Sequence, residues 1–186
     1  LKPAEAVELV TTELRHALRS KTRVAIKASA GLGKSVVAAQ QLIALPDLGK
    51  LYVDIFVPSR KEQLETKARL LAAAERAGVK TDILVIEGRT KDNCTEFEAA
   101  NALSGAGLSP SKMLCKTDSA QCRSFEGCPY RAQFLSKRPA IRVYTHAHLT
   151  TPRPEGLPAS DIAVIDESFH GVAAHVQDGI KTRDLA

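Results

Sequence analysis

The sequence predicts an α/β protein in which a parallel sheet is covered by helices, with one cysteine-rich insertion. Two patterns support this fold class. Apolar, β-branched segments alternate along the chain with segments of helical period, as in strands joined by crossover helices. The alternation lapses between residues 89 and 139, where all four cysteines lie. We therefore expect a main domain of residues 1–88 and 140–186, interrupted by a subdomain of residues 89–139.

The composition allows one substantial core. The chain has 186 residues, of which 44% are hydrophobic. Its 26 Lys and Arg against 21 Asp and Glu, with a pI of about 9.1, suit an anionic partner. No apolar stretch approaches the roughly 20 residues of a membrane span, so we expect a soluble, cytoplasmic protein, or a nuclear one in a eukaryote. Because the chain begins at Leu1 and ends soon after an acidic motif, we also expect it to be part of a longer protein.

Three elements are expected before residue 46. Apolar residues at three- and four-residue steps predict a helix over Pro3–Arg19. Arg23–Lys27 has the character of a short strand. A second helix is expected from about Gly33 to Leu45, where Pro46 would stop it.

The later elements follow the same alternation. Ser59 and Glu62 have the spacing of a capping box that opens a third helix. Its predicted buried stripe is Leu64, Ala68, Leu71 and Ala74. The predicted strands are Leu51–Val57, Asp82–Ile86, Ala140–Tyr144 and Ile162–Ile165.

A glycine-containing loop lies between the first expected strand and the second helix. The segment ASAGLGKS, Ala28 to Ser35, fits the pattern G-x-x-x-x-G-K-[ST] with alanine in the first place. Glycines there let backbone N–H groups approach phosphate oxygens. Lys34 would place a cation on the β and γ phosphates, and the Ser35 hydroxyl would ligate magnesium. The candidate nucleotide-binding residues are Ala30, Gly31, Leu32, Gly33, Lys34 and Ser35. A glycine turn that only caps a helix is the alternative.

A carboxylate pair follows the last expected strand. In IAVIDES, four largely apolar residues end in Asp166 and Glu167. Ligands of open α/β sheets bind at the carboxyl ends of the strands. Asp166 would hold magnesium through water, and Glu167 would be the general base that aligns the attacking water, so Lys34, Asp166 and Glu167 are the catalytic candidates. The alternative is an ordinary acidic strand end.

Four further segments occur in an order that is found in one family. They are FVPSRKEQL (Phe56 to Leu64), EGRTKDNC (Glu87 to Cys94), GCPYRAQF (Gly127 to Phe134) and RVYTHAHL (Arg142 to Leu149). With the loop and the acidic motif, they resemble the XPD/DinG-like iron-sulfur DNA helicases of superfamily 2, whose loop also begins with alanine. The resemblance covers residues 23 to about 170.

This resemblance implies a three-layer RecA-like P-loop NTPase domain, the first motor lobe of a helicase. It implies ATP as the ligand, single-stranded DNA as the partner, and contacts of Ser59 and Arg60 with the nucleic-acid backbone. Two features depart from the family. The acidic motif is DESFH and not D-E-A-H, which puts Phe169 at the histidine position and His170 one place late. The N-terminal helix also has no glutamine motif for adenine.

The four cysteines, Cys94, Cys115, Cys122 and Cys128, are the candidate metal ligands. They are separated by 20, 6 and 5 residues. Structural zinc sites usually have paired C-x2-4-C ligands, which are not present here. A [4Fe-4S] cluster held by four thiolates tolerates irregular spacing and agrees with the family resemblance. Zinc stays the alternative, and disulfides or four buried unligated cysteines are less favoured.

A basic run with no acidic residue extends from Pro129 to Pro154. Arg131, Lys137 and Arg138 are the candidate contacts with nucleic-acid phosphates, together with Arg142 and Arg153. Phe125, Tyr130 or Phe134 could stack on bases, although aromatic residues beside cluster cysteines commonly shield the cluster. We expect His146 and His148 on one side of a strand, as surface or core residues.

The leading hypothesis is the ATP-binding half of an ATP-dependent DNA helicase or translocase. The second hypothesis is a P-loop ATPase with a zinc-stabilised nucleic-acid-binding insertion and no unwinding activity. The third is a metal-stabilised nucleic-acid-binding module whose loop is vestigial. A complete motor closes two lobes on the nucleotide and takes an arginine from the second. We expect that lobe to be missing from this chain, and the chain alone to bind ATP weakly and to hydrolyse it slowly.

Overall fold

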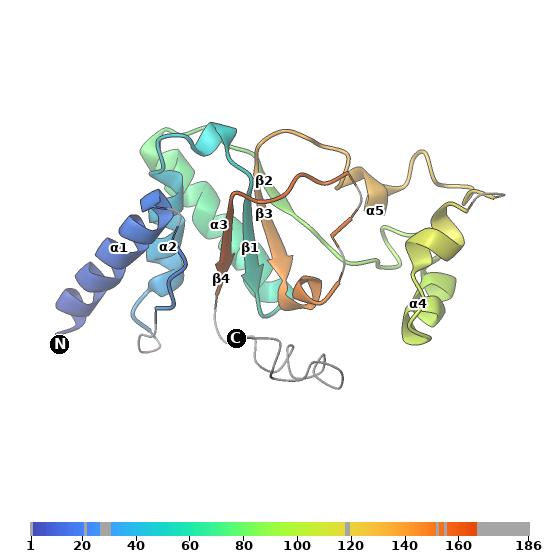
Figure 1. Ribbon diagram of the computed structural model, residues 1–186, viewed down its shortest axis with the longest axis horizontal. Coiled ribbons are helices and arrows are strands. Elements are labelled where there is room, and N and C mark those ends of the chain that lie inside the picture. Colours follow the sequence, from blue (N-terminus) through green and yellow to red (C-terminus); the bar gives the residue numbers. More distant parts are fainter. Residues whose placement is uncertain are drawn as a thin grey trace. The chain divides into compact units, whose positions relative to one another are not determined.

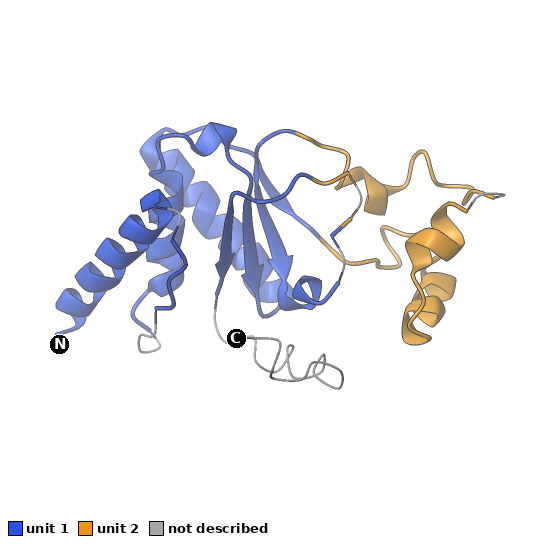
Figure 2. Ribbon diagram, viewed as in Figure 1, with its two compact units in different colours: residues 1–86, 138–153, 158–186 blue, residues 87–137, 154–157 orange. Residues whose placement is uncertain are grey.

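Figure 1 shows a computed structural model of the chain, which describes residues 2–20, 22–26, 31–117, 120–151, 153–154 and 156–166. The chain divides into two compact units, coloured in Figure 2. Unit 1 comprises residues 1–86, 138–153 and 158–186, and unit 2 comprises residues 87–137 and 154–157. The expected insertion, residues 89–139, thus differs from unit 2 by a small shift at each end and by residues 154–157.

Unit 1 is built on a sheet of four strands, all parallel. They are β1 (Val53–Val57), β2 (Ile83–Val85), β3 (Ile141–Thr145) and β4 (Ile162–Ile165), in the order β2-β3-β1-β4. Ile55 of β1 lies opposite Val143 of β3 and Val164 of β4. Parallel strands end at one edge of a sheet, so the residues after β1, β3 and β4 meet there. The α/β class is confirmed, and the arrangement is compatible with a three-layer fold.

Helices precede and connect these strands. Unit 1 has α1 (Pro3–Ser20), α2 (Lys34–Ile43) and α3 (Arg60–Ala77), with short turns η1 (Leu48–Lys50) and η3 (His146–Leu149). The side chain of Ser59 caps α3 as expected, accepting a hydrogen bond from the Glu62 amide. Gly78, with φ 66°, ends α3 in the left-handed conformation that glycine adopts without strain. In the part of the chain that the structure describes, no helix is long and apolar enough to cross a membrane.

The main core lies between α2, α3 and one face of the sheet. Leu42 and Leu70 bring the two helices together over Val53, Ile55 and Val143 of the strands, and each of these residues is almost fully buried. The described residues of α2 and α3 therefore make one helical layer.

The opposite face of the sheet has a buried ion-pair network. The Asp54 carboxylate of β1 accepts a hydrogen bond of 2.6 Å from Arg142 Nε of β3 and one of 2.7 Å from Arg153 Nη2. The side chains of Asp54 and Arg142 are only 1% and 3% exposed. Arg142 therefore does not face phosphates, which corrects its assignment to a nucleic-acid surface.

The buried face of α3 differs from the prediction. Leu64 and Leu71 are 54% and 49% exposed, and of the predicted stripe only Ala74 is buried. The buried residues are Gln63, Thr66, Leu70, Ala73 and Ala74. Helix α3 is thus rotated about its axis relative to the prediction. Gln63 explains this rotation, because its side-chain amide donates to the carbonyls of Ile86 and Val143, at 2.9 and 2.7 Å. A hydrophobic count cannot anticipate a polar residue that is buried where its side chain donates to main-chain carbonyls.

The prediction of a strand at Arg23–Lys27 is also wrong, because the described residues 22–26 form no strand. Its apolar run is short and bounded by Arg23 and Lys27. Val24 stays 48% exposed. The sheet therefore offers this segment little burial to offset the entropy of ordering it.

Unit 2 has short helices and irregular segments. Its elements are α4 (Phe97–Gly105), η2 (Ser111–Cys115) and α5 (Pro129–Ala132). An isolated antiparallel bridge joins Lys116 and Gln121. In the described part of the chain, the buried hydrophobic residues of unit 2 are Cys94, Ala100 of α4 and Leu157, so this unit has little core of its own.

Candidate functional site

The phosphate-loop candidate is described from Gly31 to Ser35. Gly31 and Gly33 have φ angles of 81° and 69°, in the left-handed region. Among the described residues, no atom beyond the adjoining residues lies within 4 Å of a Cβ built on either glycine, so the backbone angles, and not crowding, require glycine here. Helix α2 begins directly at Lys34, and the amides of Val36 and Val37 are bonded to the Gly33 carbonyl. Ala28 and Ala30 lie outside the described residues.

The loop meets the acidic strand end. Asp166 follows β4, which pairs with β1, and its amide donates to the Phe56 carbonyl of β1 at 2.9 Å. The Ser35 hydroxyl donates to Asp166 Oδ2 at 2.5 Å. The structure therefore brings together two of the oxygens that the sequence assigned to one magnesium ion. Glu167, Phe169 and His170 lie outside the described residues.

His146 is a site residue that sequence reasoning missed. It was expected on a strand, but β3 ends at Thr145 and His146 begins the turn η3. His146 is 3% exposed, and Nε2 lies 2.9 Å from the Asp166 carbonyl oxygen. The available signal was its position directly after β3, since residues after parallel strands share one edge with the acidic motif.

The nucleic-acid candidates of unit 1 lie at two opposite edges of its sheet. Ser59 and Arg60 are exposed and follow β1, so they lie at the edge of the sheet that holds Asp166. The Ser59 hydroxyl donates to the Glu62 carboxylate at 2.8 Å. Arg138 precedes β3 and therefore enters unit 1 at the opposite edge of the sheet. Lys137 is exposed in unit 2.

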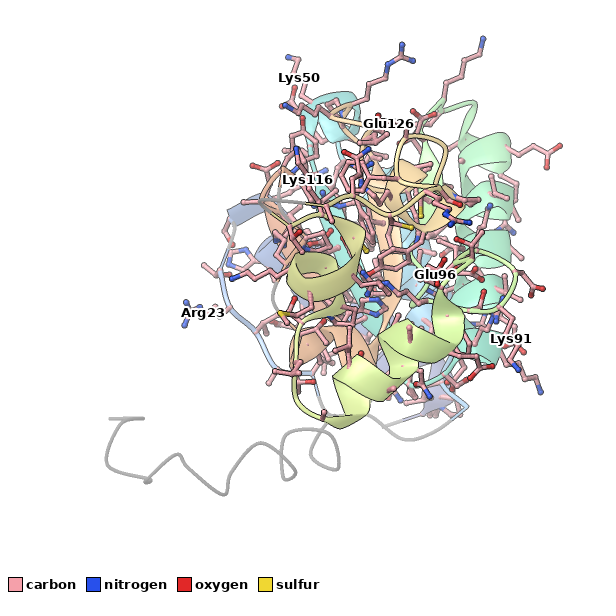
Figure 3. The ribbon with its side chains drawn as sticks, turned by 90° about the vertical axis from the view of Figure 1, so that its right-hand side faces the viewer. Arg23, Lys50, Lys91, Glu96, Lys116 and Glu126 are labelled. Carbon is pink, nitrogen blue, oxygen red and sulfur yellow. The ribbon has the colours of Figure 1, made fainter. Side chains whose placement is uncertain are left out.

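All four cysteines line one cavity in unit 2. Glu96, which also lines this cavity, is labelled in Figure 3. All four thiols are free. The other lining residues are Arg89, Thr95, Glu96, Leu114, Phe125, Tyr130 and Arg131. Among the described residues, no three Cys, His, Asp or Glu side chains form a group that could hold a metal ion as they stand. The four cysteines therefore line one cavity, but their sulfur atoms do not converge on a single metal position.

Local hydrogen bonds bring the cysteine segments together. The Cys122 amide donates to the Cys115 carbonyl at 3.0 Å, beside the bridge between Lys116 and Gln121. The Asn93 carbonyl accepts from the Tyr130 amide at 3.1 Å. The first contact pairs the two middle cysteines. The second brings the segment that ends in Cys94 to the segment that begins with Cys128.

Two arginines stack on aromatic rings at the cavity. The Arg89 guanidinium lies 4.2 Å from the Tyr130 ring centroid and donates from Nη2 to Cys115 Sγ at 3.5 Å. The Arg131 guanidinium lies 3.3 Å from the centroid of Phe125 and donates to its carbonyl. These contacts place cations beside the thiols and aromatic surface around them. The contact of Arg131 with nucleic acid stays a prediction.

The electrostatics of the cavity couple the thiols. Burial raises the pKa of the Cys94 thiol, and negative charge on Cys128 or Cys115 raises that pKa further, while Arg89 opposes the shift. Thiolates in this cavity therefore repel one another. A cationic group bound between them would relieve that repulsion.

Comparison of the chain with protein-family models, with curated proteins and with solved structures found no match.

Proposed function

We propose that the chain is the ATP-binding half of an ATP-dependent DNA helicase or translocase, in a RecA-like P-loop domain. The observation that carries the proposal is the 2.5 Å contact between the Ser35 hydroxyl and the Asp166 carboxylate. These residues are 131 positions apart. A glycine turn that only caps a helix has no reason to meet the acidic end of a neighbouring strand.

Each residue of this site has a task in binding and hydrolysis. Gly31 and Gly33 let backbone N–H groups reach phosphate oxygens, and Lys34 at the start of α2 neutralises the β and γ phosphates. Ser35 and Asp166 would hold magnesium, which supplies charge neutralisation at the phosphates when bound. Glu167, the proposed general base, follows Asp166 in the sequence.

Single-stranded DNA is the proposed partner because Ser59 and Arg60 lie at the same edge of the sheet as the nucleotide site. Both follow β1, and Asp166 follows its neighbour β4. A change at the nucleotide could thus reach the DNA-contacting residues through adjacent strand ends. This short path supports a motor function.

Replacing Arg60 tests this partner. We expect Arg60→Ala to weaken binding of a single-stranded oligonucleotide uniformly across sequences. Losing one phosphate contact should also lower the slope of log K against log salt by roughly 0.7. Fluorescence anisotropy over a range of salt concentrations measures both quantities. ATP binding by this variant should equal that of the unmodified chain.

Arg76→Ala is the matched control, because Arg76 is an exposed arginine at the other end of α3. It removes the same charge from the same helix, away from the nucleotide edge. Equal losses of affinity in the two variants would show that only net charge matters. No loss in Arg60→Ala would remove the proposed DNA contact.

The second part of the proposal concerns unit 2. Its cavity fits a four-thiolate group by its chemistry, since all four cysteines face it and are free, with Arg89 donating to one of the sulfurs. We propose that Cys94, Cys115, Cys122 and Cys128 hold a [4Fe-4S] cluster, with zinc as the alternative. The cluster would act mainly as a staple for a unit with little core of its own.

A further inference from the structure

We propose that His146 is a positioning residue for the magnesium-binding carboxylate. Through its ring N–H it holds the backbone of Asp166 so that the side chain stays at Ser35. This inference rests on the proposed nucleotide site and adds a residue to it. It concerns one contact, the 2.9 Å approach of His146 Nε2 to the Asp166 carbonyl oxygen.

The contact has a defined direction. A backbone carbonyl oxygen only accepts hydrogen bonds, so Nε2 of His146 must carry the hydrogen. The residue is 3% exposed, which leaves Nε2 little access to solvent. His146 is therefore a donor to the main chain of Asp166, and it is not placed to take a proton from a water at the nucleotide.

The position of His146 in the fold makes this contact unusual. His146 follows β3, while Asp166 follows β4, and β1 lies between these two strands. The side chain thus reaches across the end of β1 and ties together two strands that are not neighbours. An ordinary ladder hydrogen bond cannot make this link, because it joins adjacent strands only.

The contact adds a hydrogen bond at the carbonyl of Asp166 to the one that its amide already makes. The Asp166 amide donates to the Phe56 carbonyl, which fixes the peptide group before Asp166. His146 holds the carbonyl oxygen of Asp166. These two main-chain contacts restrain the backbone of Asp166, whose carboxylate meets the Ser35 hydroxyl at 2.5 Å.

The test compares two amides of different length. The side-chain nitrogen of glutamine can occupy the place of histidine Nε2, whereas that of asparagine falls short by one methylene. Binding of a fluorescent ATP analogue is measured in Mg²⁺ and in EDTA for the unmodified chain, His146→Gln, His146→Asn and His146→Leu. The difference between the two conditions reports the contribution of the metal.

We expect His146→Asn and His146→Leu to weaken the Mg²⁺-dependent part of binding by about 10- to 100-fold, the usual effect of losing a residue that orients a metal ligand. His146→Gln should keep most of it. Affinity in EDTA should be the same in all four proteins, because the phosphate loop is unchanged. Replacing a residue that only fills space would not produce a loss of affinity that is confined to Mg²⁺.

His148→Asn is the matched control. His148 is in the same turn, but its Nδ1 lies 3.3 Å from the Thr145 hydroxyl and its ring packs against Tyr144. Equal values for His146→Gln and His146→Asn, or equal losses in His146→Asn and His148→Asn, would overturn the assignment. If His146→Leu fails to fold, the comparison of glutamine with asparagine still decides. An unmodified chain that binds no ATP analogue would refute the nucleotide site itself.

Discussion

Lys34→Ala is expected to weaken ATP binding by about 10- to 100-fold and to reduce ATP hydrolysis below detection. The lysine is the first residue of α2 and follows Gly33, so it stands where the phosphates would meet the helix N-terminus. A hydrogen bond to a charged group contributes about 1.5–3 kcal/mol, and about 1.4 kcal/mol corresponds to a tenfold change in affinity. Isothermal titration with ATP and Mg²⁺ measures the effect.

Lys50→Ala is the control for net charge. The Lys50 side chain is 83% exposed in its pair with Asp47, so its removal changes the charge of the chain and little else. ATP binding should be unaffected in this variant. If Lys34→Ala also left ATP and DNA binding intact, the loop would be vestigial, and a metal-stabilised nucleic-acid-binding module would become the better hypothesis.

Cys128→Ser is expected to abolish cluster binding. All four cysteines line the same cavity, so we expect each of them to be a ligand of the cluster. Unmodified protein purified without oxygen should be brown, with about four irons and acid-labile sulfide per chain. The variant should be colourless, and limited proteolysis should cut it within residues 87–137, because the metal supplies part of the folding free energy of such a unit.

Met113→Ser is the matched control for the cysteine variant, since it removes a sulfur-containing side chain of unit 2 that is 56% exposed. It should keep the colour and the iron. Colourless unmodified protein with one zinc per chain would instead support the zinc alternative. Iron retained at full stoichiometry in Cys128→Ser would contradict the four-cysteine assignment.

Much of unit 1 could be predicted because its signals are local. The apolar, β-branched runs at β1, β3 and β4 and the Ser59 cap are visible within a few residues each. The approach of Ser35 to Asp166 could also be anticipated, since the carboxyl ends of parallel strands meet at one edge.

The remaining features depend on partners that are distant in the sequence. Gln63 is buried where its side-chain amide donates to the carbonyls of Ile86 and Val143, and these contacts rotate α3 away from the face that Leu64 and Leu71 suggest. Arg142 belongs to a basic run that suggests phosphate contacts, but the structure pairs its guanidinium with the Asp54 carboxylate. His146 gains its place only from its contact with Asp166 across β1.

The most direct test of the nucleotide site is the affinity of ATP for the unmodified chain in Mg²⁺ and in EDTA, beside the same pair of values for Asp166→Asn. The contact between Ser35 and Asp166 predicts tighter binding in Mg²⁺ and the loss of that gain in the variant. Affinity that is independent of Mg²⁺ in the unmodified chain, or a gain that survives in Asp166→Asn, would contradict the proposed site.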